Sequence, residues 1–86
     1  MKFEDLVFKP TNAAYYDGVF CEVRFANGYG ASIIKTTMSY GGKQGLYELA
    51  VLKGEDICYD TPVASDVLGW LSESDVTDTL QKIEAL

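Results

Sequence analysis

Histidine is missing from this chain of 86 residues, and cysteine occurs only twice, as Cys21 and Cys58. The two cysteines do not form a CxxC pair, and a zinc site needs further thiolates or imidazoles. We therefore expect no metal and no cofactor. The simplest interpretation of the cysteines is reduced thiols in a cytoplasmic protein, and a disulfide between them stays open.

Groups that activate a nucleophile are also missing. Neither cysteine has a histidine to deprotonate it, and no G-x-S-x-G motif occurs. The neighbouring carboxylates of Glu55 and Asp56 fall in an expected turn, whereas acid–base catalysis needs a pocket that separates their pKa values. We expect that the chain is not an enzyme.

The basic side chains form no cluster, so direct binding to a nucleic acid is not expected. No apolar run approaches the ~20 residues of a membrane-spanning helix. Lys2 is followed by Phe3, Glu4 and Asp5 instead of an apolar leader. These features predict a protein with neither a membrane nor a nucleic acid as its direct partner.

The net charge of −6 is unevenly distributed. Residues 1–54 carry six basic and five acidic groups, a net of +1, whereas residues 55–86 carry eight acidic groups and only Lys82, a net of −7. A solvated surface is the simpler interpretation of this acidic third. The alternative is a face that meets a basic partner.

Hydrophobic residues make up 48% of the chain, which is enough for a globular core. The length predicts a single domain over residues 1–86, near the lower limit for a chain that folds alone. Residues 27–52 have the pattern of a small antiparallel sheet at the centre of this domain, because two glycine-rich turns there bracket apolar, β-branched and aromatic runs. We expect an α+β fold, a small antiparallel meander of three or four strands with a C-terminal helix on one face.

The clearest strand is residues 19–25, where Val19, Cys21, Val23 and Phe25 lie on one face and alternate with Phe20, Glu22 and Arg24 on the other. Residues 26–28 (Ala-Asn-Gly) predict a three-residue hairpin turn with glycine in the left-handed region. This register sets Phe25 opposite Tyr29, Val23 opposite Ala31, Cys21 opposite Ile33, Phe20 opposite Ile34 and Glu22 opposite Ser32.

Further strands are expected at residues 29–37, 46–52 and 57–59, with a short edge strand at residues 3–8 that ends before Pro10. Residues 11–18 predict a loop. Ser72 is the expected N-cap of a C-terminal helix, with Asp75 at N3 and an apolar stripe of Val76, Leu80 and Ile83. Residues 65–71 predict a short helical turn, and Trp70 is expected to fill the core beneath the helix.

Two tyrosines beside glycine turns, Tyr29 and Tyr40, are the best contact candidates among the six in the chain. Residues 38–45 predict a mobile loop that adds Gly41, Gly42, Lys43 and Gln44 to the candidate site. This glycine-rich loop does not match the phosphate-binding pattern G-x-x-x-x-G-K-[ST], because Gln44 follows Lys43 and a strand follows the loop.

Three strings in the chain are FANGYG (25–30), SYGGKQGLYELAVL (39–52) and YDTPVASDVLGWL (59–71). With them the chain resembles a family of small uncharacterised proteins of bacteriophages and prophages, although Ala26 stands where the family pattern has proline. The resemblance implies an accessory protein in the bacterial host cytoplasm. It carries over no catalytic or ligand residue.

We therefore expect a non-enzymatic binding module that engages a host protein, including the hypothesis that it inhibits a defence system. One alternative is an oligomeric binder or sponge that cages a nucleotide signal between glycine loops around Tyr29, Tyr40 and Lys43. A second alternative is a small homodimeric structural or assembly protein that uses an uncovered edge or face of its sheet.

Overall fold

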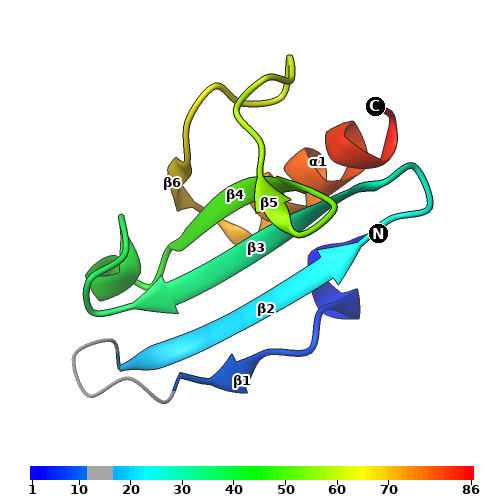
Figure 1. Ribbon diagram of the computed structural model, residues 1–86. Helices are drawn as coiled ribbons and strands as arrows, with labels where there is room; N and C mark the ends of the chain where they lie inside the picture. The colour runs from blue at the N-terminus through cyan, green and yellow to red at the C-terminus, as the bar shows by residue number, and fades with distance from the viewer. Residues whose placement is uncertain (12–16) are drawn as a thin grey trace.

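The computed structural model describes residues 1–11 and 17–86. Within them, six strands form one antiparallel sheet: β1 (Lys9–Pro10), β2 (Gly18–Arg24), β3 (Tyr29–Thr36), β4 (Tyr47–Lys53), β5 (Asp56–Ile57) and β6 (Leu68–Leu71). The order is β1-β2-β3-β4, and β5 and β6 share the far edge of β4 (Figure 1). The helical elements are η1 (Phe3–Asp5), η2 (Gly42–Gln44) and α1 (Glu73–Glu84). The α+β class is confirmed, with more strands than expected.

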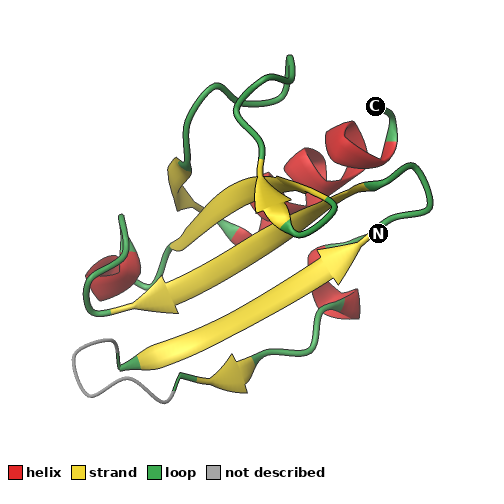
Figure 2. Cartoon of the chain, viewed as in Figure 1, coloured by secondary structure: helices red, strands yellow, loops and turns green. Residues whose placement is uncertain are grey.

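Helix α1 covers one face of the sheet (Figure 2). Its apolar stripe of Val76, Leu80 and Ile83 is fully buried against β3 and β4, where Ile33, Leu49 and Val51 alternate toward it. The helix starts as predicted, because the Ser72 hydroxyl accepts the Asp75 N–H at 3.1 Å and the Asp75 carboxylate accepts the Ser72 N–H at 3.0 Å.

The predicted hairpin between β2 and β3 is confirmed residue by residue. Val23 lies opposite Ala31 and Cys21 opposite Ile33, while the Phe25 N–H donates to the Tyr29 carbonyl at 2.7 Å. Gly28 adopts a φ of 88°, the left-handed conformation that this turn requires.

The side chain of Asn27 in this turn reaches the end of α1. Its Nδ2 donates to the carbonyl oxygens of Ile83 at 2.9 Å and of Glu84 and Leu86 at 3.3 Å each, and its Oδ1 accepts the Tyr29 N–H at 3.0 Å. The last carbonyls of a helix have no partner within the helix. Asn27 therefore ties the hairpin to the C-terminal end of α1.

The expected edge strand at residues 3–8 is wrong, since residues 3–5 form η1 and β1 begins only at Lys9. The physical reason is aromatic packing beneath the sheet. The rings of Phe3 and Phe8 lie 5.1 and 5.5 Å from the ring of Tyr47, and Leu6 also packs against the core. A single helical turn brings Phe3 and Leu6 to the same side, which a strand does not. Of the predicted loop 11–18, residues 12–16, which include Tyr15 and Tyr16, lie outside the described residues.

The expected helical turn at residues 65–71 is also wrong, because Leu68–Leu71 is strand β6 and pairs with β4. Tyr47 lies opposite Leu71 and Leu49 opposite Leu68, so Gly69 and Trp70 together oppose only Glu48. This is a β-bulge. Because of the extra residue, Leu68 and Leu71 both pack against the core although they are three positions apart.

Candidate functional site

The two most exposed aromatic side chains in the described part of the chain stack on each other. Tyr40, in the connection between β3 and β4, is 54% exposed, and Trp70 of β6 is 58% exposed. Their ring centroids are 5.3 Å apart and their planes meet at 30°. The connection and β6 lie at the same end of the sheet, where β4 begins (Figure 1). We call Tyr40 and Trp70 the aromatic pair.

The aromatic pair corrects the expectation for Trp70, which does not fill the core. Trp70 sits in the bulge of β6, and a bulge re-aims one side chain relative to a regular strand. Leu68 and Leu71 supply the core contacts of this strand, and Trp70 is left at the surface. The Trp70 N–H donates to the Tyr40 carbonyl at 3.2 Å, so the two backbones are joined as well as the two rings.

The backbone of Trp70 is strained. Its φ of 52° makes it the single non-glycine residue with positive φ among residues 1–11 and 17–86. For a bulky residue this conformation costs about 1–2 kcal/mol. Strain of this kind persists where the surrounding structure holds it, and it gathers at functional sites.

A glycine next to each ring makes room for this arrangement. A Cβ on Gly41 would lie 2.9 Å from the Trp70 Cα, and a Cβ on Gly69 would lie 2.6 Å from the Tyr40 Cβ. Either contact is closer than real Cβ atoms approach, so an alanine at either place would push the pair apart. The geometry of the aromatic pair therefore depends on two glycines from different segments.

Of the predicted site residues 41–44, the two glycines have a structural role, because the neighbouring backbone leaves no room for a side chain at either position. Gly41 is buried beneath Trp70, and a Cβ on Gly42 would lie 1.8 Å from the Thr36 carbonyl oxygen. Lys43 and Gln44 are exposed on η2, which replaces the expected irregular loop with one turn of 3-10 helix. Tyr40 is joined to β4, because its N–H donates to the Glu48 carboxylate at 3.2 Å.

Tyr29, the other tyrosine predicted to bind, lies at the opposite end of β3 from Tyr40. It begins β3, whereas Tyr40 follows the end of that strand, so the two are separated by about 25 Å of extended chain. The Tyr29 ring is half-buried against the core, and the Lys53 ammonium lies 5.8 Å from its centroid. One protomer does not bring Tyr29 and Tyr40 into a single site.

Sequence reasoning missed Trp70 as a site residue. The available signal is the segment LGWL, where a glycine interrupts an apolar run and two leucines stand three apart. A glycine inside a strand suggests a bulge, and a bulge turns the next side chain outward. A helical turn explains the same leucine spacing, so the choice between the two depends on the free edge of β4.

Both cysteines are free thiols. Burial raises the pKa of the Cys21 thiol, with a smaller contribution from Glu22, and an N–H of Val7 and the charge of Lys9 act in the opposite direction. Cys21 is therefore protonated at neutral pH. Among the described residues, no group of three or more acidic or cysteine side chains is placed to hold a metal ion. Within the same residues, no helix has the length and hydropathy needed to cross a membrane.

Comparisons with protein-family models, with curated proteins and with solved structures gave no match. The resemblance to small phage proteins therefore stays a prediction, and the site is argued from its own geometry.

Proposed function

We propose that this chain is a non-enzymatic protein-binding module and that the aromatic pair is its principal contact. The observation that carries the proposal is the strained, exposed Trp70 stacked on the exposed Tyr40. Tryptophan and tyrosine are the residues most enriched in the hot spots of protein interfaces. A pair already fixed by strand β6 and by backbone hydrogen bonds loses little conformational entropy on binding.

The proposed partner presents arginine or lysine side chains to this surface. The faces of tryptophan and tyrosine rings attract cations, and Arg is the most frequent partner. The Glu48 carboxylate lies beside Tyr40, and the chain carries a net charge of −6. An acidic protein is steered toward a basic surface at low salt. In line with the resemblance to phage accessory proteins, the proposed partner is a protein of the bacterial host, encountered in its cytoplasm.

The test compares the wild-type chain with Trp70→Ala and Tyr40→Ala in capture from bacterial host lysate, read by quantitative mass spectrometry. The matched control is Tyr59→Ala, because Tyr59 is an exposed tyrosine of β5's trailing loop. A specific partner is recovered by the wild-type and control chains and lost by the other two. With the purified partner, calorimetry then gives an affinity about thirtyfold weaker for Trp70→Ala, the usual cost of truncating a hot-spot residue.

Two results would overturn the proposal. The first is equal recovery by the wild-type and Trp70→Ala chains when both are folded by circular dichroism. The second is a small ligand, and no protein, retained by the wild-type chain in native mass spectrometry after exposure to lysate. A nucleotide retained on an oligomer would favour the sponge alternative, since bases also stack on exposed aromatic rings.

A further inference from the structure

Strand β2 has an outer edge that the sheet leaves open. β1 pairs with β2 only at Phe20 and Val19, whereas β2 continues to Arg24. Figure 1 shows β2 running well past the short arrow of β1. The last residues of β2 therefore have a strand partner on the β3 side alone. An open edge is a template for pairing with another strand.

The outward backbone groups of this edge belong to Glu22 and Arg24. The Phe25 N–H donates to the Tyr29 carbonyl, so Phe25 and Tyr29 form a hydrogen-bonded pair of the β2–β3 ladder. Bonded positions alternate along an antiparallel ladder, so Val23 and Cys21 also bond toward β3. Glu22 and Arg24 turn their N–H and C=O groups away from β3. Phe20, the next residue in that series, is the one paired with Lys9 of β1.

We propose that β2 pairs antiparallel with β2 of a second copy, with Val23 on the two-fold axis. This register places Glu22 opposite Arg24 of the second copy and Arg24 opposite Glu22 of the second copy. The two sheets then continue as one. Such a contact is isologous, because the same residues serve both copies.

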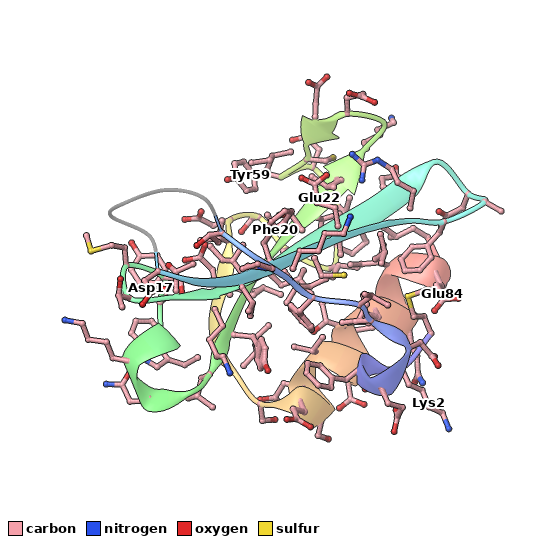
Figure 3. All side chains as sticks on the ribbon, turned by 90° about the horizontal axis from the view of Figure 1, so that it is seen from below. Lys2, Asp17, Phe20, Glu22, Tyr59 and Glu84 are labelled. Atoms are coloured by element: carbon pink, nitrogen blue, oxygen red, sulfur yellow. The ribbon has the colours of Figure 1, made fainter. Side chains whose placement is uncertain are left out.

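Charge selects this register from its neighbours. A register centred on Glu22 would set the two Glu22 carboxylates opposite each other, and one centred on Arg24 would do the same with the two guanidinium groups. Like charges directly opposite destabilise a strand pair, and opposite charges stabilise it. Within one chain Glu22 and Arg24 already lie 3.3 Å apart on the face away from α1. Figure 3 shows Glu22 on that face beside Phe20.

The other face of the edge carries apolar groups. Val23 meets Val23 of the second copy, and Cys21 lies opposite Phe25 of the second copy. Both Val23 and Phe25 are half-buried at the margin of the core, so pairing extends the core of each copy. Val7, beside Cys21, is 74% exposed, and with Cys21, Phe20, Lys9 and Glu22 it lines a hollow of about 280 Å³. The register brings Phe25 of the second copy to this hollow.

The length of the open edge also fits. β2 ends at Arg24, and its hairpin turn begins at Ala26. In the proposed register Ala26 of the second copy falls opposite Phe20, where β1 begins to pair. The chain of the second copy therefore turns away at the point where the edge is already occupied.

The experiment measures the mass of the full chain by analytical ultracentrifugation over a range of concentrations. The wild-type chain is expected to be in equilibrium with a dimer. Arg24→Glu sets carboxylate against carboxylate and Glu22→Arg sets cation against cation, so each raises the dimer dissociation constant by about tenfold or more. The double exchange Glu22→Arg with Arg24→Glu restores opposite charges in both copies and returns the constant toward the wild-type value.

A cross-link tests the register independently of affinity. Val23→Cys places the two thiols at a non-hydrogen-bonded pair of antiparallel strands. The Cα atoms of such a pair lie about 4.5 Å apart, within the range of a disulfide. Mild oxidation is expected to give a covalent dimer of Val23→Cys and none of the control Thr37→Cys, an exposed position outside β2. A wild-type chain that stays monomeric at every concentration overturns the proposal, as does a dimer unaffected by the charge reversals. Trp70→Ala leaves this dimer intact, so its outcome is separate from that of the proposed function.

Discussion

The turn after β2 and the connection after β3 each carry a tyrosine beside glycine, yet their side chains have different surroundings. In the first, Asn27 bonds to three carbonyls at the end of α1 and Tyr29 packs half-buried against the core. In the second, Tyr40 is exposed and stacks on Trp70. The first turn holds the fold together, and the second presents a surface. Glycine and tyrosine in a turn do not by themselves distinguish the two roles.

The largest effect is expected from Gly30→Ala, in β3 directly after the first of these two turns. A Cβ at Gly30 would lie 2.2 Å from the Val23 carbonyl oxygen of β2, so the central strands must separate. We expect a loss of about 2–3 kcal/mol in the free energy of unfolding, measured by urea titration. Gly45→Ala in the second region is the control. A Cβ there meets nothing within 4 Å, so only its φ of 78° costs about 1 kcal/mol. Equal losses for the two variants would contradict the comparison.

Removing the side chain of Asn27 tests the link between hairpin and helix. Asn27→Ala removes the side-chain donor shared by the carbonyls of Ile83, Glu84 and Leu86, and we expect it to lower the free energy of unfolding by about 1–2 kcal/mol. The measurement is chemical denaturation followed by circular dichroism. Gln44→Ala, a change at an exposed residue of η2, serves as the control and is expected to stay within about 0.5 kcal/mol of wild type. An Asn27→Ala chain as stable as this control would show that the cap adds nothing.

The strained backbone at Trp70 predicts that glycine at this position gives a more stable chain than alanine, the reverse of the usual order. Trp70→Gly removes both the ring and the steric cost of the positive φ, whereas Trp70→Ala removes the ring and keeps that cost. The glycine variant is therefore expected to be more stable than the alanine variant by about 1 kcal/mol, measured as a difference in thermal unfolding. Both variants lose the proposed partner. Identical stabilities would mean that the backbone at Trp70 relaxes without cost.

The smallest effect is expected at the other end of α1, where Asp75 completes the capping box. Hydrogen bonds from Ser72 lower the pKa of the Asp75 carboxyl below its ordinary range, and the backbone N–H contributes more than the hydroxyl. A lowered pKa in the folded chain means that the carboxylate contributes stability above the ordinary pKa of aspartate, at about 4, and that this contribution fades as the pH falls through the lowered value.

Asp75→Asn is therefore expected to be less stable than wild type at neutral pH, by an amount that shrinks as the solution is acidified below about pH 4. Urea unfolding of both chains at a series of pH values measures this difference. A gap that is constant across the acid range would argue against an ionised cap. Binding through the aromatic pair is expected to be the same in both chains at neutral pH.

Local patterns predicted much of the fold because they act over a few residues. The alternation in residues 19–25 and the Ala26–Gly28 turn fixed the register of the β2–β3 hairpin, since a shift of one residue moves every apolar side chain to the wrong face. The Ser72–Asp75 cap and the stripe of Val76, Leu80 and Ile83 placed α1. For the candidate site, the sequence identified Tyr40 and missed Trp70.

Tertiary structure decided the rest, because those choices depend on partners distant in the chain. Residues 68–71 became a strand since β4 offered a free edge, and the resulting bulge sent Leu68 and Leu71 to the core and Trp70 to the surface. The Phe3 and Phe8 rings meet Tyr47 beneath the sheet, which no local preference encodes. The sequence by itself determined the hairpin and the helix. Only long-range packing gave the two glycine-containing turns different roles, one capping α1 and the other stacking Tyr40 on Trp70.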